Sequence, residues 1–222
     1  MNTSISLRPL RICTGALLAA LTLWGAVAAH ASGLDSLETF VKTARSGRAT
    51  FTQVVTAPPK EGVAGRSKTS TGRFEFERPG HFRFVYQKPF EQVIVADGQT
   101  LWLYDVDLNQ VSTRKQAQVL GSTPAALIAA APDLKALEAD FTLQAAPDKD
   151  GLQWAQATPK LRDGQLQSVR LGFRGTDLAV LDVQDSFGQR SVLTFSNFEM
   201  NPALPATTFV FRPPQGADVV RQ

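Results

Sequence analysis

The chain has 222 residues, with 23 lysines and arginines, 20 aspartates and glutamates, and one cysteine. A formal charge of +3 is too small to indicate a nucleic acid or a strongly anionic surface as a partner, and one cysteine excludes a disulfide framework. A chain of this length can bury the core of one domain without cross-links.

The first 31 residues have the pattern of a secretory signal peptide. Arg8 and Arg11 precede an apolar run from Gly15 to Ala29, which leads into the small-residue triplet Ala29-His30-Ala31. A basic stretch, a short apolar run and small residues, in this order, are typical of a segment that is cleaved on export. A membrane anchor would require roughly 18 or more apolar residues. We therefore expect residues 1–31 to be removed.

The predicted mature chain, residues 32–222, is expected to be one soluble, monomeric domain in the periplasm. Cys13 precedes the apolar run instead of following it, so it cannot become the acylated first residue of a lipoprotein. Without Arg8 and Arg11, the mature chain holds 21 basic and 20 acidic residues. It is therefore nearly neutral.

The mature part begins with a predicted helix. Leu34, Leu37 and Val41 recur at helical spacing, and Ser32 can cap the first turn. This spacing predicts a helix from about Leu34 to Ser46. After it, apolar and polar residues alternate with a period of two, which is typical of half-buried strands.

The alternating stretches indicate one large antiparallel sheet. The strongest hairpin signal is Asp97-Gly98, which lies between two apolar runs. Four further apolar runs follow in the second half: 169–173, 178–183, 192–198 and 209–211. We predict about ten or eleven antiparallel strands, too many for a flat sheet, which curl into a barrel or half-barrel. The predicted fold class is mainly β, an incomplete antiparallel barrel with short helices.

A short apolar segment interrupts the strands. Thr123 and Pro124 can begin a helix that ends before Pro132, and residues 133–139 predict another helical turn or two. Between the hairpins of a curled sheet, such a helix can bury its apolar face in the open mouth of the sheet. We therefore predict that it plugs the mouth.

The mature chain offers little for catalysis. His81 is its only histidine and lies beside a turn, and no G-x-S-x-G motif is present. Residues 105–109 imitate the start of a calcium loop, but Gln110 stands where the loop requires glycine. Alternation turns Glu75 and Glu77 away from their aromatic neighbours. These observations favour a binding protein, with no enzymatic activity, metal or cofactor.

Arg78 precedes Pro79 at the end of an apolar strand. Its guanidinium has five donors and no acceptor, so it could bind carbonyl groups at the end of a helix. Arginines near turns are more often solvated. The residues alone leave both interpretations open.

Several stretches of the mature chain match, in order, the motifs of a known family. They are Ala49 to Gln53, Gly72 to Phe82 with the pair Arg78-Pro79, Val95 to Tyr104, Asn109 to Val111, Ser122 to Ile128, and Phe209 to Gly216. The set resembles the LolA family of periplasmic outer-membrane lipoprotein carriers. The resemblance covers essentially the whole mature chain, and the set is more specific than any one piece.

The resemblance implies an incomplete barrel with a helical lid over a hydrophobic cavity that carries acylated lipoproteins. Such carriers receive lipoproteins from an ATP-driven complex in the inner membrane and deliver them to an acceptor at the outer membrane. Arg78 matches a latch that binds the lid, with partners at Leu127, Ile128 and Ala129. The predicted ligand-binding residues are aromatic and lie on strands: Phe51, Phe74, Phe76, Phe82, Phe84, Tyr86, Trp102 and Tyr104.

The match also has departures. Ala125 and Ala126 stand where bulkier lid residues are expected, so the lid and the ligand preference can differ. Two other functions stay open on the same fold. One is a binding or shuttle protein for another lipid or glycolipid, and the other is a lipid hydrolase that uses carboxylates in the cavity. The sequence does not specify the cargo, its number of acyl chains or the acceptor.

Overall fold

One helix and a curled sheet dominate the computed structural model, which describes residues 32–60, 62–119, 133–161 and 164–222. The helices are α1 (Gly33–Thr43), α2 (Gln116–Val119) and α4 (Leu134–Asp140). The strands are β1 (Ser46–Thr56), β2 (Ser67–Glu77), β3 (His81–Lys88), β4 (Gln92–Asp97), β5 (Thr100–Asp105), β6 (Gln110–Lys115), β7 (Phe141–Lys149), β8 (Leu152–Pro159), β9 (Leu166–Arg174), β10 (Asp177–Asp185), β11 (Arg190–Met200) and β12 (Asp218–Arg221). The predicted signal peptide and the predicted helix at 123–131 lie outside the described residues.

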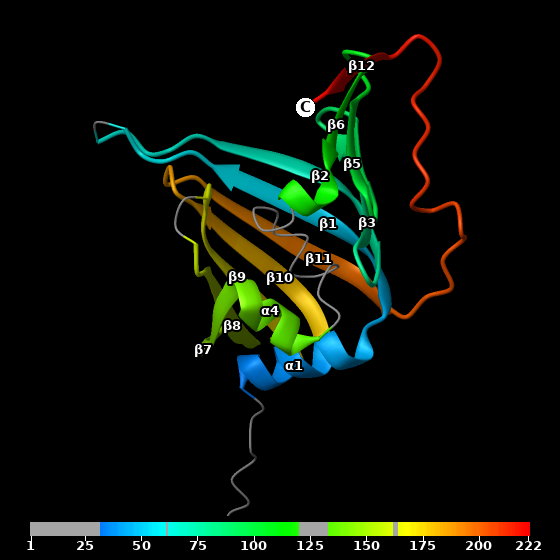
Figure 1. Ribbon diagram of the computed structural model, residues 1–222. Helices are drawn as coiled ribbons and strands as arrows, with labels where there is room; N and C mark the ends of the chain where they lie inside the picture. The colour runs from blue at the N-terminus through cyan, green and yellow to red at the C-terminus, as the bar shows by residue number, and fades with distance from the viewer. Residues whose placement is uncertain (1–31, 61, 120–132, 162–163) are drawn as a thin grey trace, which may run out of the picture. The chain divides into compact units, whose positions relative to one another are not determined.

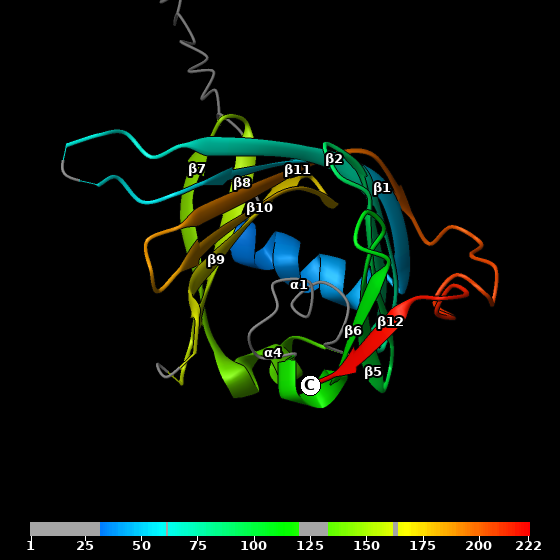
Figure 2. The same cartoon turned by 90° about the horizontal axis from the view of Figure 1, so that it is seen from above.

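The described strands form a single sheet in the order β12-β6-β5-β4-β3-β2-β1-β11-β10-β9-β8-β7. Neighbouring strands are antiparallel, except that β12 runs parallel to β6. The two end strands, β12 and β7, do not pair, so the sheet stays open. It curls around α1 (Figures 1 and 2). The prediction of a mainly β, incomplete barrel is confirmed.

Helix α1 lies on the concave side of the sheet. Its first turn is fixed by a capping box. The Ser32 hydroxyl accepts a hydrogen bond from the Asp35 amide, and the Asp35 carboxylate accepts one from the Ser32 amide. Leu37, Phe40 and Val41 form its buried stripe. The helix ends at Thr43, three residues before the predicted end, because Ser46 already begins β1.

Aromatic rings join α1 to the sheet. The ring of Phe40 lies 6.1 Å from Phe76 of β2, 5.7 Å from Phe173 of β9 and 6.0 Å from Phe198 of β11, measured between centroids. Buried aromatic pairs at such distances contribute about 0.5–1.5 kcal/mol each beyond the burial of their area. The core therefore holds both halves of the sheet against one helix.

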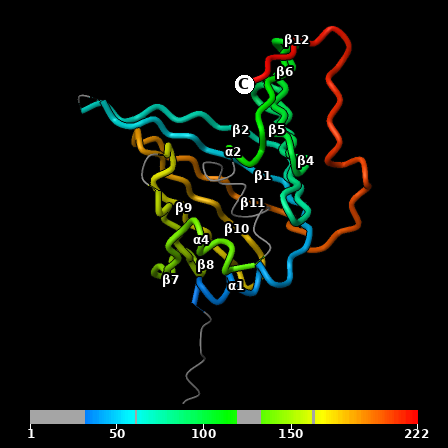
Figure 3. The backbone as a smooth tube through the Cα atoms, in the orientation of Figure 1, coloured from blue at the N-terminus to red at the C-terminus, as the bar shows by residue number. Residues whose placement is uncertain are grey.

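The C-terminal segment crosses from one half of the sheet to the other. After β11 it runs along the sheet and ends as β12 beside β6, the path of the orange-to-red tube in Figure 3. The strand predicted at 209–211 is wrong: these residues have no strand partners. The rings of Phe209 and Phe211 pack instead on His81 and on Trp102, at centroid distances of 5.6 Å and 5.5 Å.

Candidate functional site

Strands β1, β2 and β3 present a row of aromatic side chains on the concave face. The ring centroids of Phe74 and Phe84 lie 4.4 Å apart, and those of Phe51 and Tyr86 lie 5.0 Å apart. Five of the predicted ligand-binding residues belong to this aromatic floor and are at most 7% exposed: Phe51, Phe74, Phe76, Phe82 and Phe84. In this conformation their rings are core, so a ligand reaches them only if neighbouring groups move.

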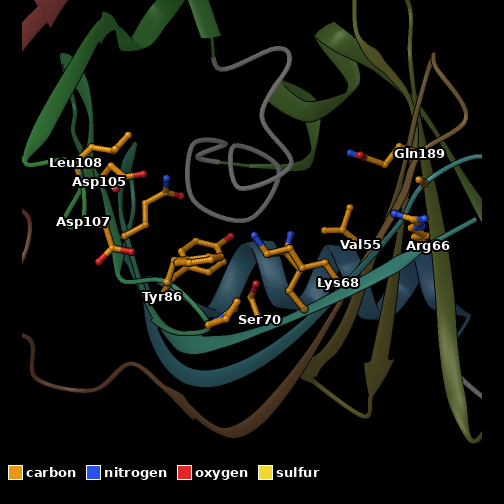
Figure 4. Close-up of a pocket in the computed structure, with 14 residues that line it drawn as sticks. Val55, Arg66, Lys68, Ser70, Tyr86, Asp105, Asp107, Leu108 and Gln189 are labelled. Atoms are coloured by element: carbon orange, nitrogen blue, oxygen red, sulfur yellow. Dashed lines mark hydrogen bonds between the residues drawn. The ribbon is translucent and has the colours of Figure 1, made fainter.

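The floor continues into an open pocket of about 700 Å³. Tyr86, the sixth predicted ligand-binding residue, lines this pocket and lies at its base in Figure 4. The described lining combines apolar, amide, hydroxyl and charged side chains: Gln53, Val55, Ala57, Arg66, Lys68, Ser70, Tyr86, Pro89, Phe90, Gln92, Asp105, Asp107, Leu108 and Gln189. A pocket of roughly 300–1,000 Å³ is the usual size for a small ligand. The volume of this pocket falls within that range.

The environment of Tyr86 is apolar although its side chain borders the pocket. Its ring contacts Phe51 edge-on, at an interplanar angle of 78°, and stacks on Phe84. Burial raises the pKa of Tyr86 to about 12. The hydroxyl thus stays protonated at neutral pH and marks the boundary between the aromatic floor and the polar part of the pocket.

Most of the polar residues that line the pocket were not among the predicted ligand-binding residues. Lys68 and Ser70 precede Phe74 on β2 at even spacing, so they lie on the same concave face. The period of two could have placed them there. The partners across the pocket, such as Asp105 of β5, follow only from how the sheet curls.

Arg78 binds the end of α1. Its Nη1 donates to the carbonyl oxygens of Ala44 at 2.7 Å and Val41 at 2.8 Å, with a longer contact of 3.4 Å to Phe40. Carbonyls at the end of a helix favour a cation, and among the described residues only the Phe40 carbonyl of these three also accepts a hydrogen bond from a backbone amide, that of Ala44. Burial lowers the pKa of Arg78 to about 10, so the guanidinium stays charged at neutral pH.

The predicted partners of Arg78 in the lid, Leu127, Ile128 and Ala129, lie outside the described residues. The latch between Arg78 and the lid therefore stays a prediction. Of the two interpretations that the residues left open, the structure has Arg78 bound to helix-end carbonyls, at α1, a helix that the sequence interpretation did not consider as its partner.

The last two predicted ligand-binding residues, Trp102 and Tyr104, lie on the other face of the sheet. They pair with Val95 and Val93, whereas the concave residues Phe82 and Phe84 pair with alternate positions of β4. Both rings pack against Phe211, at centroid distances of 5.5 Å and 6.1 Å. Neither ring faces the aromatic floor.

The chemically active side chains of the described residues are dispersed. No group of three or more His, Cys, Asp or Glu among them could hold a metal ion. His81 packs against the ring of Phe209. Glu75 binds Arg48 Nε at 3.0 Å and lies on the face opposite to the aromatic floor. No helix in the described part of the chain is long and apolar enough to cross a membrane.

Comparison with known proteins identifies the family. Residues 42–212 match the family model described as "Outer membrane lipoprotein carrier protein LolA". A protein of Albidiferax ferrireducens named "Outer-membrane lipoprotein carrier protein" is 72% identical over 198 residues, which cover 87% of this chain and 93% of the relative. A protein of the same name from Methylibium petroleiphilum is 54% identical, covering 92% of this chain and 97% of the relative.

Solved structures match this chain at low sequence identity. An uncharacterized conserved protein from Thermus thermophilus superposes with a TM-score of 0.50 at 15% identity, covering 85% of this chain and 96% of the other. A LolA superfamily protein from Nitrosomonas europaea superposes with a TM-score of 0.46 at 15% identity, covering 82% and 99%. The likeness to the Thermus thermophilus protein concerns the fold alone, and the family follows from the match to the family model and from the relatives of high identity. The chain therefore belongs to the LolA family.

Proposed function

We propose that this protein is a non-enzymatic carrier that takes acylated lipoproteins across the periplasm. The observation that supports this most is the open pocket on the concave face, which continues into a floor of buried aromatic rings. The high identity to proteins named outer-membrane lipoprotein carriers supports it independently. In this role the chain is exported, its signal peptide is removed, and it acts as a monomer between a releasing complex and an acceptor.

Burial of acyl chains provides the free energy of loading. Each buried methylene contributes about 0.8 kcal/mol, so a sixteen-carbon chain contributes roughly 12 kcal/mol. A carrier must also release its cargo, so its affinity has to stay below that of the acceptor. Covering the floor in the empty state lowers the apparent affinity, because part of the binding energy must then uncover it.

Loading therefore requires the aromatic floor to open. The pocket of about 700 Å³ is of a size that suits one small ligand, whereas a cargo with several chains needs the buried rings as well. We propose that Arg78 takes part in this change through the predicted latch to residues 127–129, in addition to its bonds with α1.

A two-step transfer assay tests the carrier function. The mature protein is incubated with a purified triacylated lipoprotein, separated by size exclusion, and then mixed with acceptor vesicles or an acceptor protein. We expect a soluble one-to-one complex that releases its cargo to the acceptor, and we expect Arg78→Leu to load but to release poorly.

Capture from the native periplasm provides the complementary measurement. Mass spectrometry should find triacylated lipoproteins bound to the protein. If a single free lipid or glycolipid co-purifies instead, and no triacylated lipoprotein forms a complex in vitro, the carrier proposal is wrong.

A further inference from the structure

Five hairpin turns lie at the same end of the curled sheet. In spatial order the strands form the successive hairpins β5–β6, β3–β4, β1–β2, β10–β11 and β8–β9. Their registers align the turns: Thr56 at the end of β1, for example, pairs with Arg190 at the start of β11. The β1–β2 and β10–β11 turns lie side by side on the left of Figure 1, and a Cβ on Gly188 would lie 3.2 Å from the Cβ of Pro58. This end is called the hairpin rim, and its described turn residues are 57–60, 62–66, 89–91, 106–109, 160–161, 164–165 and 186–189.

Each turn of the hairpin rim presents one large apolar side chain to solvent. In spatial order these apolar tips are Leu108, Phe90, Val63, Phe187 and Leu161, and they are 59 to 75% exposed. The described turns at the other end of the sheet, at 78–80, 98–99, 150–151 and 175–176, have no exposed large apolar side chain. Single exposed apolar residues are normal on a protein surface. Both ends consist of turns, however, so exposure at a turn does not explain why these residues gather at one end.

Hydrogen bonds fix the backbone at two of the apolar tips. The Asp185 carboxylate accepts a hydrogen bond from the Phe187 amide at 2.9 Å, and the Asp105 carboxylate accepts one from the Leu108 amide at 3.1 Å. Both side chains are therefore held out from the sheet before any partner arrives. A fixed backbone lowers the entropic cost of contact, so these tips are pre-organised for binding.

The pattern of polar groups on the hairpin rim favours a lipid bilayer over a protein as its partner. A stable protein interface has a contiguous apolar core with polar groups around it. Here each apolar tip stands on its own turn among charges of both signs, as Phe90 does between the exposed Lys88 and Glu91. Separate apolar side chains can enter the acyl layer of a bilayer one by one, while their charged neighbours stay among zwitterionic head groups.

The open pocket ends at the same rim. Phe90 and Leu108 belong to the apolar tips and also border the pocket, which leads past Tyr86 to the aromatic floor. A bilayer against the hairpin rim would therefore face the entrance of the pocket. Acyl chains could then pass between the membrane and the aromatic floor without exposure to water.

We propose that the hairpin rim docks on the surface of a phospholipid bilayer and inserts its apolar tips among the acyl chains. The docking rests on the exposed side chains, while its use in loading or delivery rests on the proposed carrier function. Because charges of both signs surround the tips, docking depends on apolar burial and little on salt.

Flotation with phosphatidylcholine vesicles tests the docking of the mature protein without cargo. We expect association at about 0.1 M and at about 0.5 M salt alike. The triple variant with Val63→Ser, Leu161→Ser and Phe187→Ser should bind the vesicles at least about tenfold more weakly, and none of these residues lines the pocket. Val210→Ser is the matched control, because Val210 is also exposed but lies outside the hairpin rim. Thermal unfolding verifies that each variant is folded.

Site-specific labelling shows which end of the sheet meets the bilayer. Cys13, the only cysteine, lies in the predicted signal peptide, so one introduced cysteine in the mature chain carries a polarity-sensitive dye. We expect vesicles to shift the emission of the dye to the blue in Phe187→Cys and to leave it unchanged in Thr176→Cys, at the exposed β9–β10 turn of the other end. Equal shifts at both ends would contradict docking through the hairpin rim.

Three outcomes of these experiments overturn the proposal. Wild type does not float with the vesicles, its association disappears at high salt, or the dye at position 187 responds to a purified protein partner and not to vesicles. Loading from a detergent-solubilised triacylated lipoprotein separates this result from the carrier function. Normal loading without vesicle binding refutes the docking alone, whereas vesicle binding without any loading refutes the carrier function and leaves the docking intact.

Discussion

Replacing Arg78 by leucine removes the donor that binds the last carbonyl groups of α1. The two short bonds, at 2.7 and 2.8 Å, contribute about 1.5–3 kcal/mol each as charge-assisted hydrogen bonds. The guanidinium also lies 5.2 Å from the centroid of the Phe40 ring, which adds about 0.5–1 kcal/mol. Burial opposes these gains, because a pKa lowered to about 10 corresponds to a cost of roughly 3 kcal/mol. We therefore expect Arg78→Leu to lower the free energy of unfolding by about 1–3 kcal/mol.

Urea unfolding and hydrogen exchange measure this effect in the mature chain. The loss should be local, so amide protection in α1 should fall more than protection in β9 and β10. Arg78→Lys keeps a charge but only one nitrogen donor, and we expect a loss of about half the size. Arg45→Leu is a matched control, because Arg45 is exposed and surface substitutions change stability by about 0.5 kcal/mol or less. An unchanged unfolding midpoint together with unchanged α1 protection in Arg78→Leu would refute the role of Arg78 in holding α1.

Three further predictions concern the pocket, a turn and a close contact. In a Tyr104→Phe background Tyr86 is the only tyrosine, and its absorbance should titrate near pH 12, because burial raises the pKa of Tyr86 to about 12. The contribution of Tyr86 to stability is complete below pH 10 and is lost as the pH rises toward 12. A titration midpoint near pH 10 would contradict this. Burial acts to raise the pKa of Asp97, but hydrogen bonds from the Trp102 indole and from backbone amides outweigh it and lower that pKa. The contribution of Asp97 to stability is therefore present above pH of about 4 and lost as the pH falls. Asp97→Asn should lower the free energy of unfolding by about 1 kcal/mol at pH 7 and by less at pH 3. An equal loss at both pH values in urea unfolding would argue against this role of Asp97. A Cβ on Gly33 would lie 2.0 Å from the backbone carbonyl of Trp154. Gly33→Ala should therefore lower the free energy of unfolding by about 1–3 kcal/mol. A variant as stable as the parent in thermal unfolding would show that α1 can shift freely.

Much of the fold could be predicted from sequence patterns of a few neighbouring residues. The hairpin at Asp97-Gly98 formed as expected, because the strands β4 and β5 that it joins are adjacent in the chain and the Asp97 carboxylate accepts the Gln99 and Thr100 amides. The cap at Ser32 and the helix from Leu134 depend likewise on residues within one turn. Period-two alternation placed the aromatic rings of β2 and β3 on one face without any knowledge of their partners.

The errors and omissions concern contacts between distant segments. Residues 209–211 have the alternation of a strand, but β12 takes the edge of β6 and leaves Phe209 and Phe211 to pack on the outer face. Trp102 was expected on the ligand side because it is aromatic and lies in a matching motif. Its face depends on the register of β5 against β4, and that register turns it toward Phe211.

By itself, the sequence determined that the chain forms a mainly β, incomplete barrel with an aromatic face and belongs to a family of lipoprotein carriers. Only the tertiary structure decided that Arg78 binds the end of α1, and that the basic side chains of Arg66 and Lys68 face Asp105 and Asp107 across one pocket. The physical reason is range. Turn, cap and alternation are properties of a few neighbouring residues, whereas the facing walls of a pocket depend on how a twelve-stranded sheet curls, and that curvature sums the twist of every strand pair between them.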